Sequence, residues 1–514
     1  MDSEIAYRQR KQKKPSPSGT FLSRVFIHEK LNSIPGYFIV TAIALLFGYL
    51  VATKFALGLT LFGAVLGLFV FLVCLASIEA GLYLNILYSF FAFHLSRLLF
   101  NDSFPVGVVT DILIMSTFLG IIVSGKSLKK AINQFAKIPL VAVILLLVFY
   151  LLIELFNPYG HSFDGWFQSF RRYLGSVLLL FVSFNVFDSM ERVKRFIVVL
   201  FILCTITAIY GCIQQWHGLF DFELAWVRSD DNRAGLYFIM GSFRKFSTMS
   251  DPTAFGVAMA ASAIFFLIYA WHLKNVYHKI MYFTGVLFMI LAMGYSGTRT
   301  ANIMMAAGIF IYILLSLNKP ATRKFAAFAV VIFLLLLYGP YANPSIIRFR
   351  TSFMGSKDES YKVREVNRAF IQPYIYSHPI GGGLGTTGAS GLRFNRGHYL
   401  SGFPPDSGYL RKALETGWIG LAIIMILYFM VLRFGVRKYF VSDNDEVKII
   451  YAACIGGIFS FYMAEFAQEA IGQITDIVIY YPMIAIMLKM PYFKGFRQED
   501  DLSAHADEAT PVIT

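Results

Sequence analysis

Long apolar blocks are the feature that most constrains the fold of this chain. Each runs for about 17–25 residues, the length that an α-helix needs to cross a hydrocarbon core of about 30 Å. Hydrophobic residues make up 57% of the sequence and charged residues only 15%, which excludes an ordinary soluble protein. A membrane β-barrel would instead show alternating segments of about ten residues. The sequence therefore predicts an all-α polytopic membrane protein.

The apolar blocks predict about 14 membrane-spanning helices. We expect them at residues 36–53, 57–77, 81–99, 105–124, 138–156, 172–188, 195–214, 252–272, 279–296, 300–317, 323–341, 416–434, 447–465 and 472–491. From the fourth span on, the connections after the even-numbered spans are basic, whereas the connection EFAQEAIGQITD is acidic. Because lysine and arginine favour cytoplasmic loops, this pattern places the N-terminus in the cytoplasm.

This topology divides the chain into five parts. A basic cytoplasmic tail at 1–35 precedes the first eleven spans at 36–341. A large, partly helical outer loop at 342–416 precedes the last three spans at 417–492 and a polar cytoplasmic tail at 493–514. Both tails have the polar composition of disordered segments.

The net charge of +14 is mostly topogenic, because its basic residues are spread among the cytoplasmic loops. That spread also argues against a nucleic-acid partner. The outer loop at 342–416 is basic as well, against the topological rule, so an anionic ligand is the natural explanation; incidental charge on a solvated loop is the alternative. The four cysteines lie in apolar segments and have no metal-binding or disulfide spacing.

Two arginines of the outer loop have a spacing that suits phosphate. The segment DESYKVREVNRAFIQ predicts a helix that ends before Pro373. Arg364 and Arg368 lie one turn apart on one face, where two guanidinium groups can bind phosphate oxygens. Pairing with Asp358 and Glu365 on the same helix is the alternative interpretation.

The run HPIGGGLGTTG follows this helix. Gly381, Gly383 and Gly385 can adopt positive φ and allow a ligand to approach the backbone closely. No Lys-Ser/Thr pair follows, so this is not a nucleotide-binding P-loop. The glycines could form a backbone nest for an anion or, as glycine content alone favours, a flexible connection.

Two residues before the twelfth span are candidates for a general base. Asp406 lies in a Pro-Pro-Asp-Ser turn, where it could cap the next helix or accept a proton. His398 has a side chain whose pKa suits proton transfer at neutral pH. Spacing alone does not choose between them.

Three further arginines lie at the predicted outer ends of spans. Arg299 belongs to SGTRTA, Arg244 precedes the span at 252–272, and Arg172 opens the span at 172–188. Each could anchor a helix at the interface, but an arginine that faces a cavity at the membrane edge is a functional candidate. We expect these side chains to meet at one surface.

Four stretches, taken in order, carry a resemblance. They are RKFSTMSDPTAFG, the GTR of SGTRTA, RxxxRAF ahead of SHPIGGGLG, and DSGYLRKALETGWIG. Together they resemble the O-antigen ligase and O-antigen polymerase family over about residues 235–435. The resemblance implies a membrane-embedded, inverting glycosyltransferase of the bacterial inner membrane whose active site faces the periplasm. It also implies a reaction without a metal or another cofactor.

The resemblance supplies ligands and partners as well. The donor would be a glycan on undecaprenyl pyrophosphate, and the acceptor a glycan or glycolipid hydroxyl in or beside the lipid bilayer. A chain-length regulator is a partner that a polymerase would use. The leaving pyrophosphate needs fixed cations. The implied pyrophosphate ligands are Arg299, Arg364 and Arg368, with Arg244 and Arg172 as weaker candidates.

One departure from the family pattern favours a polymerase. Ligases that attach glycans to lipid A-core typically carry a histidine at the start of the motif that ends in Glu-x-Gly-x-x-Gly. This chain has Asp406 at that position. Polymerisation of polysaccharide repeat units is therefore the expected function, and ligation with His398 as the base is the alternative. A lipid-linked sugar transporter is a third alternative, but no inverted repeat supports it.

Overall fold

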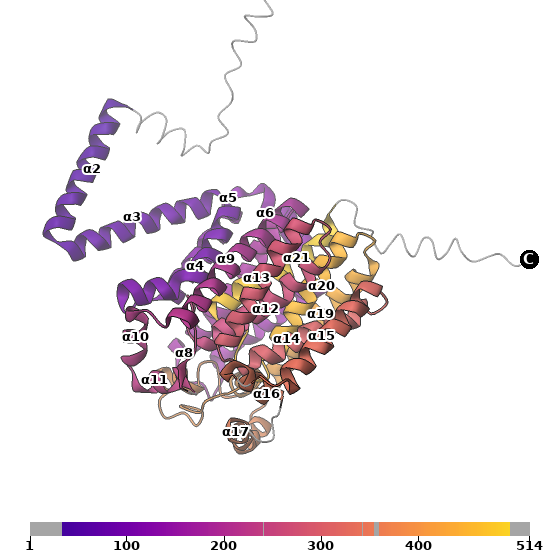
Figure 1. The fold of residues 1–514 in the computed structure, drawn as a ribbon. Coiled ribbons are helices and arrows are strands. Elements are labelled where there is room, and N and C mark those ends of the chain that lie inside the picture. Colours follow the sequence, from indigo (N-terminus) through magenta and orange to yellow (C-terminus); the bar gives the residue numbers. More distant parts are fainter. Residues whose placement is uncertain (1–32, 240, 342, 354–358, 494–514) are drawn as a thin grey trace, which may run out of the picture. The chain divides into compact units, whose positions relative to one another are not determined.

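The computed structural model describes residues 33–239, 241–341, 343–353 and 359–493 (Figure 1). The predicted cytoplasmic tails at 1–35 and 493–514 thus lie almost entirely outside the described residues. The chain divides into two compact units at Ser77. The first contains α2 (Ile34–Thr53) and α3 (Phe55–Ala76), whose apolar side chains are largely exposed, as suits contact with lipid.

The second unit is a bundle of twelve long helices (Figure 1). They are α4 (Ile78–Phe100), α5 (Val106–Ser124), α7 (Pro139–Ile153), α8 (Phe163–Val186), α9 (Met190–His217), α12 (Pro252–Trp271), α13 (Val276–Tyr295), α14 (Arg299–Ser316), α15 (Pro320–Tyr338), α19 (Gly408–Val441), α20 (Asp445–Ala464) and α21 (Ile474–Lys489). With α2 and α3, they account for every predicted span. The predicted all-α polytopic membrane fold is therefore confirmed.

Among the described residues, eleven helices are long and apolar enough to cross a membrane. The predicted spans outside this set are α2 and α3, whose apolar stretches are shorter, and α8, which carries Arg171 and Arg172. These charged side chains lower the mean hydropathy of α8.

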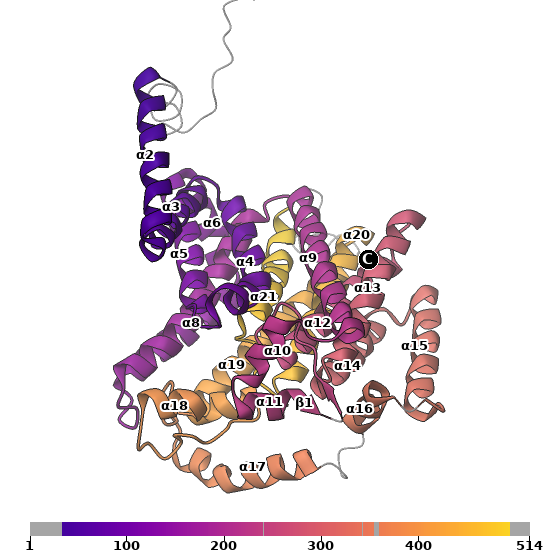
Figure 2. The same cartoon turned by 60° about the vertical axis from the view of Figure 1, so that its left-hand side comes forward.

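Shorter elements connect the bundle helices. They are α6 (Lys126–Ala136), η2 (Glu154–Phe156), α10 (Asp221–Arg228), α11 (Asp231–Tyr237), β1 (Phe238–Ile239), β2 (Ser242–Phe243), α16 (Pro344–Phe353), α17 (Glu359–Ser377), α18 (Gly388–Phe394) and η4 (Met490–Tyr492). The two strands form an antiparallel hairpin in which Phe238 pairs with Phe243 and Ile239 with Ser242. In Figure 2, α17 lies across the lower end of the bundle, near α16 and α18.

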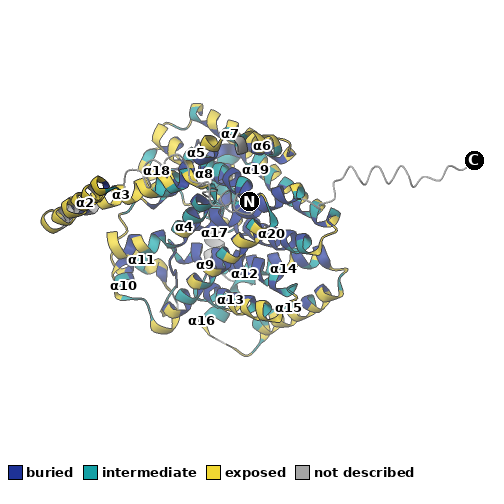
Figure 3. Ribbon diagram, turned by 90° about the horizontal axis from the view of Figure 1, so that it is seen from above, coloured by how far each residue is buried: buried dark blue, intermediate teal, exposed yellow. Residues whose placement is uncertain are grey.

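Helices α12, α20 and α21 form the centre of the bundle, because 78–83% of the most apolar stretch of each of these helices is buried. Seen along the bundle, the dark, buried ribbon is central and the exposed ribbon lies outside (Figure 3). Glycines allow this packing: a Cβ at Gly308 of α14 or Gly456 of α20 would strike the Ile264 and Ile268 side chains of α12, respectively. By contrast, α15 is only 11% buried and presents an apolar face for lipid.

Two boundaries in the outer loop differ from the sequence prediction. Helix α17 does not end before Pro373 but runs through it to Ser377, so that prediction was wrong. Proline removes a single main-chain hydrogen bond, and on an exposed helix water can satisfy the carbonyl that this leaves. Helix α19 begins eight residues earlier than the predicted span, and non-helical Gly417 separates its outer segment from the span.

Candidate functional site

The start of α19 shows which residue caps this helix. Ser407 occupies the N-cap position, where its hydroxyl accepts a hydrogen bond from the Leu410 N–H and donates one to the Glu465 carbonyl. Asp406 lies one residue earlier and is half-buried. Its side chain accepts a hydrogen bond from the Asn367 amide of α17, at 3.5 Å. Helix capping therefore does not explain Asp406, which leaves its carboxylate for another role.

Arg368 lies on α17 beside Asn367 and reaches the connection between α20 and α21. Its Nη2 donates to the Phe466 carbonyl at 2.9 Å, and its guanidinium lies 4.8 Å from the centre of the Phe466 ring. Since the Glu465 carbonyl accepts the Ser407 hydroxyl, Arg368 and Asp406 share one neighbourhood at the end of the bundle where α19 begins. Arg364 lies one turn earlier on α17, but its side chain lies outside the described part.

A cluster of three arginines forms around the turn at 296–298; we call it the arginine cluster. Arg244 Nε donates to the Ser296 carbonyl at 2.9 Å, and its Nη2 donates to Thr298 Oγ1 at 3.0 Å. Arg348 of α16 donates from Nη1 to the Gly297 carbonyl at 2.8 Å. Arg299 begins α14 directly after the turn. The three side chains thus come from three separate segments of the chain.

Local structure positions each member of the arginine cluster. The β1–β2 hairpin, with Gly241 at φ 77°, delivers Arg244 immediately after its second strand. Gly297 adopts φ 62°, so the turn can bend tightly before α14 begins. Close packing also fixes the turn, because a Cβ at Gly256 of α12 would collide with the Thr298 side chain.

Positive charge is concentrated in the arginine cluster. Burial, followed by the charge of Arg348, lowers the pKa of Arg244 to about 10. Burial and then Arg299 lower the pKa of Arg348. With a pKa of about 10, the Arg244 guanidinium stays protonated at neutral pH. Asp251 is a carboxylate that acts on Arg244, but its Oδ1 is occupied by the N–H groups of Thr253 and Ala254 at the start of α12.

A second group of basic side chains is electrically balanced. Arg171, Arg172, Arg411 and Lys412 line a cavity of about 140 Å³ between α5, α8, α19 and the α20–α21 connection. Arg171 pairs with Asp111 at 2.9 Å, Arg411 pairs with Glu415 and Glu469, and Lys412 pairs with Glu465. The four cations face four carboxylates, so this group suits helix packing better than it suits a polyanion. Arg172, which is exposed, lies here and not in the arginine cluster.

The glycine-rich run packs against the last residues of the first segment of α19. Gly381, Gly383 and Gly385 all have positive φ, between 74° and 92°. The Gly382 and Gly383 N–H groups donate to the carbonyls of Leu414 and Glu415, at 2.8 and 3.0 Å. These donors are therefore not available to an anion, and residues 381–387 are buried. The run is neither an anion nest nor a loose connection.

His398 lies in a different place from Asp406. It lines a cavity of about 490 Å³ together with His161, His378 and several tyrosines, and Asp406 is not among the lining residues. His398 Nδ1 accepts a hydrogen bond from the Leu400 N–H at 3.1 Å. Burial, and then the neighbouring His161 and His378, lower the pKa of His398, so its imidazole is neutral at pH 7.

The structure therefore brings some of the site residues predicted from the sequence close together and places others apart. Arg244 and Arg299 come together, Arg368 and Asp406 share a neighbourhood, and Arg172 and His398 lie elsewhere. Sequence reasoning did not select Arg348 as a site residue. The sequence feature that could have identified Arg348 is the basic segment PSIIRFR. It directly follows a predicted span on the predicted outer side, where the positive-inside rule does not explain positive charge.

These features define a class: a polytopic helical membrane protein whose helix connections hold a cationic cluster and a half-buried carboxylate. Residues 284–425 match the family model described as O-antigen ligase. This match confirms the resemblance to the O-antigen ligase and polymerase family over this segment. It contains Arg299, Arg348, Arg368 and Asp406, whereas Arg244 precedes it. The comparison with curated proteins finds no match.

The family indicates a glycosyltransferase type of enzyme. The apolar helices make the protein a multi-pass membrane protein.

Proposed function

We propose that this protein polymerises surface-polysaccharide repeat units at the periplasmic face of the bacterial inner membrane. It transfers a glycan from undecaprenyl pyrophosphate to a hydroxyl of an acceptor glycan. The observation that carries the proposal is the convergence of Arg244, Arg299 and Arg348 on a single turn. A pyrophosphate offers the matching charge, and guanidinium groups bind its oxygens through paired N–H donors.

The arginine cluster is arranged before any ligand arrives. Arg244 uses Nε and Nη2 for hydrogen bonds within the protein, and Arg348 uses Nη1. Each guanidinium has five N–H donors, so both keep donors that can turn to a ligand. Cations that are already fixed by main-chain carbonyls need no reorganisation as charge develops on a leaving group.

In the proposed reaction, Asp406 is the general base. It takes the proton from the acceptor hydroxyl while that oxygen attacks the anomeric carbon of the donor. The bond from this carbon to the pyrophosphate oxygen breaks, and undecaprenyl pyrophosphate leaves with one additional negative charge. A single displacement inverts the anomeric centre. The arginine cluster neutralises the leaving group, and Arg368 with Arg364 can contribute from α17.

Lysine substitutions test the arginine cluster. In a deletion strain, we expect Arg299→Lys and Arg244→Lys to leave single repeat units on the lipid carrier, because lysine cannot bind phosphate oxygens in a bidentate manner. Arg393→Lys, a change of an exposed arginine on α18, is the matched control and should restore full-length polymer. Full-length polymer from both cluster variants, at equal protein level, would refute the proposed role.

The biochemical form of the test separates transfer from transport. Protein purified in detergent should transfer glycan from a lipid-linked donor in the absence of sealed vesicles. It should do so with EDTA present, because the arginines supply the positive charge in this proposal. Loss of transfer on chelation would contradict the metal-independent mechanism.

A ligase is the second candidate, with His398 as its base, because a lowered pKa favours the neutral imidazole. Its Nδ1 accepts the Leu400 N–H, so the neutral ring carries its proton on Nε2, and Nδ1 would have to release this hydrogen bond before it could accept the proton of a hydroxyl. The glycan of a deletion strain distinguishes the two functions. A polymerase deletion leaves single repeat units on the carrier, whereas a ligase deletion leaves long polymer there and none on the final acceptor.

A further inference from the structure

The cavity that His398 lines has no role in the polymerase mechanism; we call it the aromatic cavity. Three separate stretches form it: the connection between α7 and α8, the last turn of α17, and the loop that follows α18. Its volume of about 490 Å³ falls within the range of about 300–1,000 Å³ that is usual for ligand sites.

The wall of the aromatic cavity is a series of rings. Tyr374 stacks on His378, with ring centres 3.8 Å apart and planes 8° apart, and on Tyr399, with values of 5.2 Å and 10°. Tyr159 meets His378 edge to face at 4.7 Å. Tyr399 stacks on Tyr374, lines the cavity and is 61% exposed, so much of its ring remains accessible. The C–H bonds of a sugar pack well on such ring faces, because apolar surface is buried while the hydroxyls remain free.

Polar groups of the cavity suit sugar hydroxyls. The stretches that line the cavity contain no acidic residue. Local hydrogen bonds engage Nδ1 of His378 and Nδ1 of His398 and leave the Nε2 atoms. The Nε2 atoms of both rings can therefore bind hydroxyl groups. Arg396 adds a cation at the rim, which an acidic sugar would meet. Among the described residues, no group of three or more His, Cys, Asp or Glu side chains is placed to hold a metal ion.

Backbone contacts connect the aromatic cavity to the carboxylate of the reaction centre. Asn367, which contacts Asp406, precedes Tyr374 on α17 by about two turns, or about 10 Å. A Cβ at Gly382 would lie 2.8 Å from both His398 Cε1 and the Tyr374 hydroxyl, and the Gly382 N–H is bonded to α19. The cavity wall and the start of α19 are thus parts of one packed unit.

We propose that the aromatic cavity binds a pyranose unit of the acceptor glycan while another part of that glycan presents its hydroxyl to Asp406. This inference rests on the proposed function and assigns the substrate class of a second subsite. The cavity has the aromatic wall and hydroxyl-binding groups of a carbohydrate site, and α17 joins it to the general base.

Binding of a glycan without its lipid tests this inference. The probe is the repeat-unit oligosaccharide released from the host's own surface polysaccharide, added to the purified full-length protein and followed by calorimetry. Tyr399→Ala should weaken binding by about tenfold or more, the usual effect of removing an aromatic anchor. Tyr399→Trp should retain binding, since it keeps an open aromatic face.

Tyr376→Ala is the matched control, because Tyr376 is an exposed tyrosine on α17 that does not line the cavity. It should bind like the wild type. In transfer assays, Tyr399→Ala should raise the KM for the acceptor and leave kcat nearly unchanged. Equal binding by wild type and Tyr399→Ala, or no binding by the wild type, would overturn the inference.

Failure of the proposed function gives a different result. Arg299→Lys should lose transfer and still bind the oligosaccharide, because the arginine cluster does not line the cavity. If Arg299→Lys kept full transfer while Tyr399→Ala lost binding, the proposed pyrophosphate site would be wrong and the glycan subsite would stand.

Discussion

At the residue scale, adjacent Asp406 and Ser407 divide two tasks that the sequence could not separate. Both types cap helices well, and a boundary inferred from sequence is uncertain by a residue or more. The structure gives the cap to Ser407, whose hydroxyl bonds both Leu410 and Glu465. Among the described side chains, Asp406 accepts a long hydrogen bond from Asn367. The two residues therefore have different expected mutant phenotypes.

Substitution of the two residues should separate stability from activity. Asp406→Asn should abolish glycan transfer with little change in melting temperature, because the amide keeps the shape but cannot accept the proton. Ser407→Ala should lower the free energy of unfolding by about 1 kcal/mol, the usual effect of losing a cap, and keep measurable transfer. Thermal unfolding and transfer assays on both variants decide this. Retained activity in Asp406→Asn would exclude the base role.

The histidines of the aromatic cavity predict a dependence of stability on pH. The folded protein holds the pKa of His398 below its ordinary value of 6.5 through burial and the nearby His161 and His378, with Arg396 at the same rim. The unfolded chain then binds more protons below about pH 6.5, so stability falls as the pH drops below that value. Protonation would also remove the acceptor of the Leu400 N–H.

We therefore expect the melting temperature of the wild type to fall from pH 7 to pH 5.5. His398→Gln should show a smaller fall, because glutamine keeps an acceptor and does not titrate. Parallel curves for the two proteins would show that His398 does not contribute.

At the element scale, the outer segment of α19 and the glycine-rich run fold as one piece. Gly381 and Gly417, both at positive φ, lie so close that a Cβ on either would meet the other's backbone. A small core of Ile371, Leu400 and Leu414 adds α17 to this piece. The sequence predicted a turn with special backbone geometry here, but it could not show the partner, because that contact joins residues far apart in the chain.

Two glycine substitutions measure this contact. Gly397→Ala changes a residue at φ 89° with open space around it, so it should cost about 1–2 kcal/mol of conformational strain alone. Gly417→Ala meets the Pro379 carbonyl as well and should reduce the yield of folded, monodisperse protein far more. Size-exclusion profiles and melting temperatures in detergent compare the two. Equal effects would mean that the Gly381–Gly417 contact is not required.

At the scale of the whole molecule, periodicity and length were sufficient for the bundle, because each apolar block forms its helix independently of the others. They were not sufficient for the site. Arg244, Arg299 and Arg348 are brought together by a hairpin, a turn and a short helix that follow different spans. Arg172, also at the outer end of a span, joins a charge-balanced group instead. Which arginines meet depends on how the helices are arranged, and no single segment of sequence carries that information.

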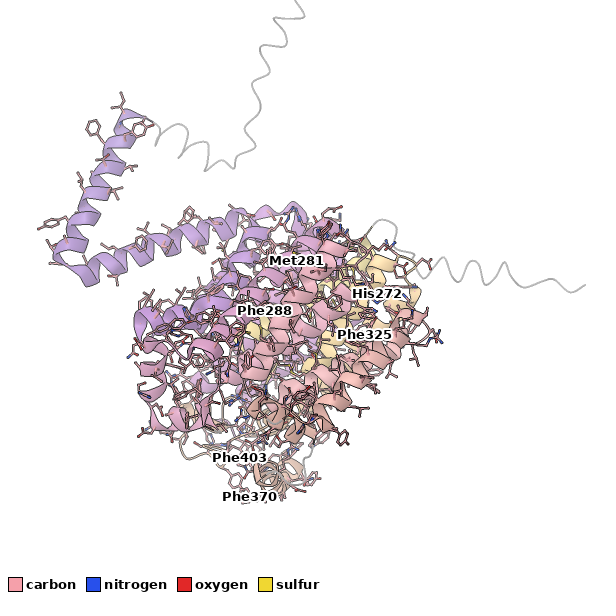
Figure 4. The ribbon with its side chains drawn as sticks, viewed as in Figure 1. His272, Met281, Phe288, Phe325, Phe370 and Phe403 are labelled. Carbon is pink, nitrogen blue, oxygen red and sulfur yellow. The ribbon has the colours of Figure 1, made fainter. Side chains whose placement is uncertain are left out.

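Membrane topology can be tested on the whole molecule. The described native cysteines, Cys74, Cys204, Cys212 and Cys454, are all buried, as predicted, and should not react in the folded protein. Phe370 lies on the exposed side of α17, at the lower end of the molecule in Figure 4. Phe370→Cys should react with an impermeant maleimide added to spheroplasts. Lys274→Cys, in the α12–α13 connection, should react only after lysis; the reverse pattern would invert the proposed orientation.

The hydrogen bonds from Gly382 and Gly383 to α19 have a consequence for the regiochemistry of the product. In the proposed enzyme, these main-chain hydrogen bonds fix the distance between a sugar bound to Tyr399 and the carboxylate of Asp406. This distance then determines which hydroxyl of the bound glycan reaches Asp406 and becomes glycosylated. Related polymerases could thus change their linkage by altering the length of the connection between Gly385 and Asp406, with the arginine cluster left intact.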